Sequence, residues 1–145
     1  MKRRKMLRLL GLAPPVFLVS CRDAKVPSAP TIVIGKVIDE NDMPIEGASI
    51  RMYGIKQQGL SGTGTFSIDT LTGKDGNYTL SYVVPRGTDF VKVSLEGTST
   101  INDQTNNYYV QRNGTGLYVK PGNDPELLWG DYGKKTTINF QYKKR

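Results

Sequence analysis

Histidine is absent from this 145-residue sequence, and cysteine occurs once, at Cys21. Without histidine there is no Ser-His-Asp or Cys-His catalysis, and nearly every zinc or copper site is excluded as well. A lone cysteine cannot form an internal disulfide. We therefore expect no catalytic residues, no metal and no cofactor, and a domain that holds together by packing alone.

Acidic residues are missing from the first eight positions, which carry five basic ones: Lys2, Arg3, Arg4, Lys5 and Arg8. Residues 9–19 then form an uncharged, mostly apolar run. This run is shorter than the about 20 apolar residues that a membrane span needs, and Pro14 and Pro15 would break a helix in its middle. A basic segment followed by a short apolar segment predicts a secretory signal peptide over residues 1–20.

The apolar run ends in Leu-Val-Ser-Cys at residues 18–21, which resembles the lipobox of bacterial lipoproteins. In that motif, the peptidase needs a small residue before the cleaved bond, a role for Ser20, and the Cys21 thiol takes a diacylglyceryl group. The resemblance implies cleavage between Ser20 and Cys21, lipidation of Cys21, and acylation (palmitate) of the new amino terminus. An ordinary signal peptide that happens to end near a cysteine is one alternative, and a twin-arginine export signal at Arg3-Arg4 is another.

Cleavage would change the charge balance of the protein. The full chain has 20 basic and 13 acidic residues, and five basic ones lie in the signal peptide, so the mature chain would carry 15 against 13. The high isoelectric point of about 9.5 therefore reflects targeting, and nucleic-acid binding loses its main support. We expect the mature chain to be lipid-anchored in the bacterial cell envelope, at the outer membrane, although residues 22–23 fit no sorting rule.

The mature chain is long enough for one domain. Residues 21–30 are polar and proline-containing, which predicts a flexible tether. Beyond them, short β-branched and aromatic runs alternate with turn residues over the domain, residues 31–145. We expect an all-β fold, an antiparallel sandwich of about seven strands, whose clearest segments are residues 31–39, 45–53, 65–71, 78–84, 90–95 and 136–142. Residues 54–64 are expected to form a glycine-rich loop.

Residues 97–135 form an insert that is rich in Asn, Gly and Thr and also contains several aromatic residues. Because long structureless loops are uncommon in compact domains, we expect further strands near residues 108–111 and 117–120. The Asn113-Gly114 pair between them is typical of a hairpin turn.

Two stretches resemble the carboxypeptidase regulatory-like domain, a transthyretin-like (prealbumin-like) β-sandwich common in exported proteins of Bacteroidetes-type bacteria. Residues 35–50 read GKVIDENDMPIEGASI, and residues 72–80 read TGKDGNYTL. The family has a Gly-x-Val strand, an acidic turn and Pro-Leu-x-Gly-Ala-x-Val in the first stretch, and Thr-Asp-x-x-Gly-x-Phe/Tyr-x-Leu in the second. The chain departs from the family at Asp42, where glycine is usual, and at Gly73, where Asp is usual.

The resemblance covers residues 31–95 and implies the sandwich fold and a non-catalytic module. It also fits local physics. Asp42 tolerates a left-handed turn conformation, Gly76 suits a turn position with positive φ, and Tyr78 is then expected to be a core aromatic.

Acidic residues offer little evidence of chemistry. Carboxylate pairs such as Asp124/Glu126 or Asp39/Glu40 are the type that glycosidases use, but turn acids explain them better. Residues 39–42 also lack the spacing of a calcium loop. Asp69-Thr70-Leu71 fits a short O-glycosylation pattern associated with Bacteroidetes, and a strand end explains it equally well.

The aromatics of the insert are the main functional lead. Trp129, Tyr108 and Tyr118 are candidate glycan-binding residues, because exposed aromatic faces stack on sugar rings. The other interpretation is that they pin the insert to the sandwich. We therefore expect a non-catalytic envelope lipoprotein acting as an interaction or structural module, with an envelope protein or glycan as partner. A glycan-binding lipoprotein is the alternative, and a subunit of a surface fibre is a third interpretation.

Overall fold

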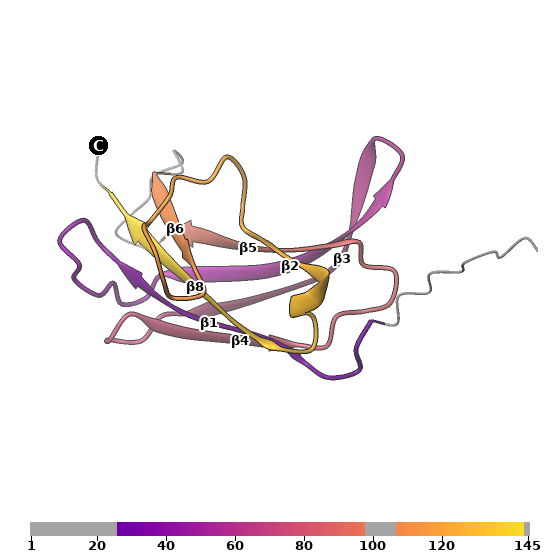
Figure 1. The fold of residues 1–145 in the computed structure, drawn as a ribbon, viewed down its shortest axis with the longest axis horizontal. Helices are drawn as coiled ribbons and strands as arrows, with labels where there is room; N and C mark the ends of the chain where they lie inside the picture. Colours follow the sequence, from indigo (N-terminus) through magenta and orange to yellow (C-terminus); the bar gives the residue numbers. More distant parts are fainter. Residues whose placement is uncertain (1–25, 98–106, 144–145) are drawn as a thin grey trace, which may run out of the picture.

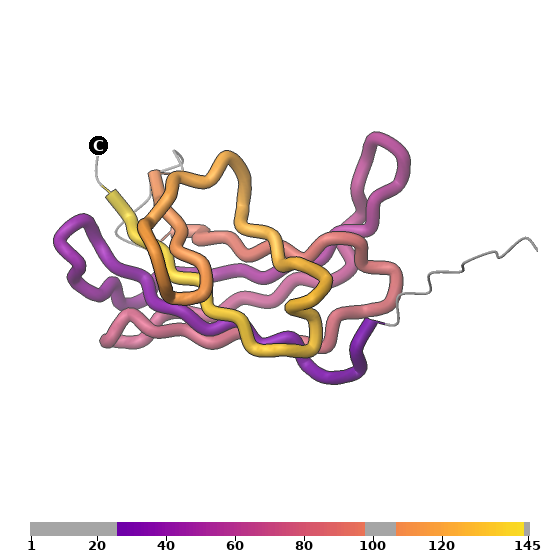
Figure 2. The backbone as a smooth tube through the Cα atoms, viewed as in Figure 1, coloured from indigo at the N-terminus to yellow at the C-terminus, as the bar shows by residue number. Residues whose placement is uncertain are grey.

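The computed structural model describes residues 26–97 and 107–143. They form two four-stranded sheets packed face to face, as Figures 1 and 2 show. The first sheet has the order β4 (Asn77–Tyr82), β1 (Thr31–Ile38), β8 (Lys135–Tyr142), β6 (Tyr108–Arg112). The second has the order β3 (Ser61–Leu71), β2 (Ser49–Gln58), β5 (Phe90–Gly97), β7 (Glu126–Leu127). A single 3₁₀ turn, η1 (Trp129–Asp131), precedes β8.

The core lies between the two sheets and follows the expected alternation of apolar residues. Tyr78 and Leu80 of β4 are buried, as are Val91 and Val93 of β5. Alternate side chains of a strand point to opposite faces, so each strand contributes every second residue to the core. The largest fully buried side chains are Phe140, Ile50, Met52, Leu127 and Ile138.

The expected all-β sandwich is confirmed, with eight strands in place of about seven. One pairing was not expected: β1 runs parallel to β8 in the middle of the first sheet. The segments 31–39, 78–84, 90–95 and 136–142 all contain the strands predicted for them.

The expected glycine-rich loop at residues 54–64 is wrong, because the two strands continue through it. β2 runs to Gln58 and β3 starts at Ser61, with Gly59 at φ 60° in the turn between them. Glycine is required inside the strands by close neighbours. A Cβ on Gly54 would lie 2.4 Å from Thr65 Oγ1, and one on Gly62 would lie 2.6 Å from Ile55 Cγ2.

The insert is divided between the two sheets. β6 pairs with β8 as part of the first sheet, and β7 pairs with β5 in the second. The Asn113-Gly114 turn is present, with φ of 58° and 66°. The strand expected at residues 117–120 is reduced to one bridge between Val119 and Val110.

Both family-like stretches meet at Tyr78. Its hydroxyl donates a hydrogen bond to the Ile138 carbonyl at 2.6 Å, and its ring is buried as expected. A Cβ on Gly35 would lie 1.8 Å from that same carbonyl oxygen. Gly35 is thus required because β1 passes directly against the Tyr78–Ile138 contact.

The turns explain the other family-like positions. Gly76 has φ 75°, and a Cβ there would lie 2.6 Å from the Val37 carbonyl oxygen. Asp42, which replaces the usual glycine, has φ 63°. Asp39 stabilises this turn by accepting hydrogen bonds from the backbone of Asn41 and Met43 at 2.8 and 2.9 Å.

The start of the domain lies inside the expected tether of residues 21–30. Val26 packs against the core. Pro27 lies so close to Gly133 that a Cβ there would be 2.6 Å away. Residues 26–30 are therefore docked on the sandwich. Within the ranges that the structure describes, no helix is long and apolar enough to cross a membrane.

Candidate binding sites around Asp124 and Trp129

Asp124 joins the two sheets through a pair of tyrosines. Its Oδ2 accepts a hydrogen bond from Tyr53 of β2 at 2.7 Å, and its Oδ1 accepts one from Tyr108 of β6 at 2.7 Å. The backbone holds Asp124 in place, because the next residue, Pro125, accepts a hydrogen bond from the Val93 amide at 2.9 Å. One carboxylate thus receives a phenol from each sheet.

Burial and the carboxylate both act on these phenols. Burial, followed by the hydrogen bond to Asp124, raises the pKa of Tyr53 and of Tyr108 well above the usual value. Both effects disfavour the charged phenolate. At neutral pH the two phenols are therefore protonated and able to donate to Asp124.

A polar cleft of about 270 Å³ opens beside this carboxylate. It is lined by Tyr53, Lys92, Tyr108, Pro121, Gly122, Asn123 and Asp124. Lys92 supplies an ammonium donor, and Asn123 supplies both a donor and an acceptor. A more apolar hollow of about 500 Å³ lies across the loop and is bordered by Val110, Leu117 and Val119.

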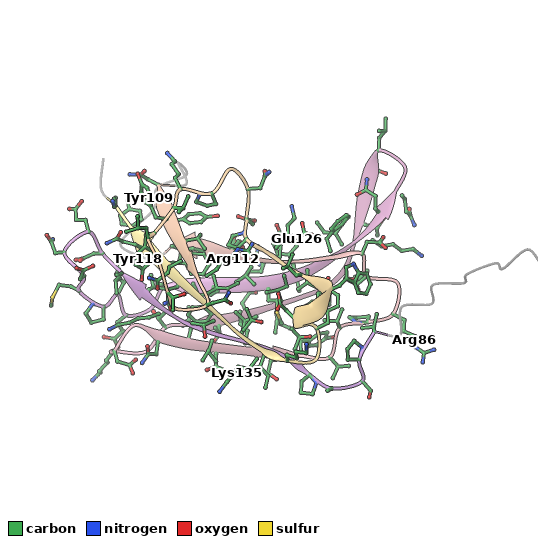
Figure 3. The ribbon with its side chains drawn as sticks, in the orientation of Figure 1. Arg86, Tyr109, Arg112, Tyr118, Glu126 and Lys135 are labelled. Atoms are coloured by element: carbon green, nitrogen blue, oxygen red, sulfur yellow. The ribbon has the colours of Figure 1, made fainter. Side chains whose placement is uncertain are left out.

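Arg112 closes one side of the apolar hollow. Its Nη1 donates to the Glu126 carbonyl at 2.7 Å, and Figure 3 shows the two side chains. Leu117 and Val119 remain largely exposed. Asp124 borders both the polar cleft and this hollow, so it stands at the junction of a hydrogen-bonding surface and an apolar one.

The arrangement around Asp124 favours binding over chemistry. Both carboxylate oxygens already accept a phenol, and no group of three or more His, Cys, Asp or Glu side chains able to hold a metal occurs in residues 26–97 and 107–143. The interpretation of Asp124 as a turn acid is wrong, since its partners are 71 and 16 residues away in sequence. For Asp39 it is confirmed by the turn that Asp39 stabilises.

The candidate aromatics of the insert do not form one patch. Trp129 is 49% exposed and packs on Tyr132 with 4.9 Å between ring centroids. Tyr108 is only 5% exposed and packs edge-on against Phe140 in the core. Burial therefore removes the Tyr108 ring from any stacking surface, and only its hydroxyl reaches the cleft.

Tyr118 and Tyr109 lie away from Trp129. Figure 3 shows both tyrosines toward the end of β8 that leads to the C terminus, whereas Trp129 precedes the start of β8. Tyr118 is half-buried, and burial together with the nearby Asp42 raises its pKa. Tyr109 lies under Lys143, whose Nζ is 4.3 Å from the ring centroid.

Sequence reasoning missed Tyr53 and Lys92. Both face outward on central strands of the second sheet, opposite each other in the β2–β5 register. Outward tyrosine in a strand was a signal that could have identified Tyr53, but nothing local linked it to Asp124. Of the other expected positions, Thr70 lies in β3, while Ser20 and Cys21 fall outside the described residues.

No protein-family model and no curated protein matches this chain. Among solved structures, the dioxygenase domain of a dioxygenase–carbohydrate-binding protein fusion from Streptomyces sp. SirexAA-E is similar at 18% identity and a TM-score of 0.43, over 84% of each chain. The major plantain pollen allergen Pla l 1 is similar at 16% identity and a TM-score of 0.40, over 81% of this chain and 95% of the allergen. 3-Chlorocatechol 1,2-dioxygenase from Rhodococcus opacus 1CP has 12% identity and a TM-score of 0.40, over 86% and 63%. Likenesses of this size leave the activity of the chain open.

Proposed function

We propose that the chain is a non-catalytic lipoprotein of the bacterial cell envelope, anchored at the outer membrane through Cys21, whose β-sandwich serves as an interaction module. The observation that carries the proposal is the position of the only cysteine. Cys21 directly follows a short apolar run and Ser20, and it precedes the first packed residue, Val26, by five positions.

The composition of the domain supports binding in preference to catalysis. The sequence offers no histidine to act as a general base, and the carboxylate nearest a cleft is already bridged by two phenols. Partner contact fits the apolar hollow beside Asp124, where Leu117 is 87% exposed and Val119 is 64% exposed. Exposed apolar side chains that line a concave surface are typical of protein-binding sites.

The anchoring test is substitution of the acylated residue. Cys21→Ala removes the thiol, so the protein should incorporate no labelled palmitate and accumulate with its signal peptide attached. Ser20→Ala keeps a small residue before the cleaved bond and should be processed and labelled normally. If Cys21→Ala protein is still processed and still needs detergent for extraction, the lipoprotein proposal is wrong.

Glycan binding is a second candidate, now centred on the Asp124 cleft. The observation that favours it is the grouping of Lys92, Asn123 and the two tyrosine hydroxyls around one carboxylate, because hydroxyl-rich ligands are recognised by several convergent polar groups. On a glycan array, Lys92→Ala and Asn123→Ala should abolish retention, while Lys120→Ala, outside the cleft, should not. If only Trp129→Ala abolishes retention, the cleft is not the site.

A further inference from the structure

We propose that the end of the sandwich that carries the β2–β3 arm faces the lipid bilayer, and that Leu60 at the tip of the arm touches it. The β2–β3 arm is defined as residues 56–63. The proposal rests on the proposed lipidation of Cys21, and it adds an orientation and a membrane-contacting surface to it.

The arm is a two-stranded projection. The pairing of β2 with β5 ends at Ile55 and Phe90, whereas the pairing of β2 with β3 continues to Gln58 and Ser61. Every residue of the arm is exposed, and Leu60 is completely so, at 107%. Figure 1 shows the arm extending beyond the sheets. An apolar side chain at the tip of such a projection contributes nothing to the core, so its partner lies outside the domain.

The arm and the amino-terminal segment leave the same end of the molecule. Thr31, the first residue of β1, pairs with Tyr82 at the end of β4. The turn that follows β4 returns to the base of the arm, where the Asp89 amide donates to the Ile55 carbonyl at 2.9 Å. Figure 2 shows residue 26, the β4–β5 turn and the arm at one end of the long axis, with the β1–β2 turn at the other.

The length of chain between Cys21 and Val26 keeps this end close to the membrane. Five residues reach at most about 17 Å when fully extended. Val26 is packed against the core, so it cannot add to that reach. An anchor at Cys21 therefore restricts the domain to orientations in which this end is near the lipid.

The charges at the two ends agree with this orientation. The end near the anchor exposes Arg86 and Lys56, and Figure 3 shows Arg86 there. The nearby Asp89 carboxylate is engaged with the Gln57 amide at 2.7 Å. The opposite β1–β2 turn carries Asp39, Glu40 and Asp42 with no basic residue. Basic side chains favour anionic headgroups, and the acidic turn is then held away from them.

Tryptophan fluorescence tests the orientation in the full, lipidated protein. Trp129→Phe removes the only tryptophan, and a new one is placed either at the arm, Leu60→Trp, or at the far turn, Met43→Trp. Met43 is a matched control, because it is also an exposed apolar turn residue, at 60%. Each protein is reconstituted in vesicles of phosphatidylethanolamine and phosphatidylglycerol with brominated acyl chains, which quench fluorescence on contact.

Leu60→Trp should lose most of its emission on brominated vesicles relative to unbrominated ones, and Met43→Trp should be unchanged. Equal quenching at both positions, or none at Leu60→Trp, would overturn the proposal. Mass measurement of the same samples separates the two levels of failure. Acylated protein without quenching at the arm refutes the orientation alone, whereas protein without an acyl chain refutes the anchor and the orientation together.

Discussion

Single residues account for much of the specificity of this fold. The family-like patterns predicted a core aromatic at Tyr78 and a turn glycine at Gly76, and both are confirmed. The reason for Gly35 was not predictable, because it depends on the Ile138 carbonyl, 103 residues away in sequence. Short motifs therefore located these residues, and only the packing between strands shows what they do.

Tyr78 is the first residue-level test. Tyr78→Ala should destabilise the domain by about 3–5 kcal/mol, the range for removing a buried aromatic ring. Tyr78→Phe should cost about 1–3 kcal/mol, because it leaves the buried Ile138 carbonyl without its donor. Urea unfolding measures both, with Leu60→Ala as an exposed control. A change within about half a kcal/mol for Tyr78→Ala would contradict its burial.

Asp124 provides the second residue-level test. Asp124→Ala leaves the Tyr53 and Tyr108 hydroxyls without their acceptor, at a cost of about 1–3 kcal/mol for each buried donor. Adding Tyr53→Phe and Tyr108→Phe to Asp124→Ala should recover part of that loss, since no donor is then left unpaired. A double-mutant cycle measures the coupling. Strict additivity of the substitutions would contradict the bridge between the sheets.

At the scale of the element, alternation identified most strands, and glycine misled the analysis at residues 54–64. Glycine usually weakens a strand, so a glycine-rich segment predicted a loop. Here Gly54 and Gly62 lie in strands because neighbouring side chains leave no room for a Cβ. β7 was missed for a different reason: at two residues, Glu126–Leu127, it is too short to show a period.

The arm offers the element-level prediction. Replacing residues 56–63 by Asn-Gly keeps the Ile55–Gly64 pairing and supplies a favoured two-residue hairpin turn. Because every removed residue is exposed, the free energy of unfolding should change by no more than about 0.5 kcal/mol. Thermal and urea unfolding are the measurements. A loss of several kcal/mol would mean that the arm packs on the domain.

At the scale of the whole molecule, composition predicted the fold class but not its topology. The parallel pairing of β1 with β8 joins the first and last strands of the domain, and no local pattern encodes such a contact. The candidate glycan site failed at the same scale. The sequence gives a list of aromatic residues in one insert, whereas the fold sends Tyr108 into the core and separates Tyr118 from Trp129.

Alkaline pH tests the burial of the tyrosines across the whole domain. Burial raises the pKa of Tyr132 to about 12 and that of Tyr53, Tyr78 and Tyr108 further. An unfolded tyrosine ionises near about pH 10. The unfolded state therefore loses protons first, and stability that is complete below about pH 10 falls as pH rises toward the folded values.

Urea midpoints should thus be constant between about pH 7 and 9 and decline above about pH 10, with tyrosinate absorbance appearing together with unfolding. The double variant Tyr53→Phe, Tyr108→Phe should show a shallower decline. A midpoint that is unchanged at about pH 12, where free tyrosine is ionised, would contradict the buried placement of these rings.

The anchor at Cys21 is the central claim, and the intact mass of the protein extracted from the membrane fraction tests it most directly. The account predicts a chain that begins at Cys21, lacks residues 1–20, and carries the added mass of a diacylglyceryl group with or without an amide-linked acyl chain. A chain that begins at any other residue, or one that begins at Cys21 with a free thiol, would contradict it.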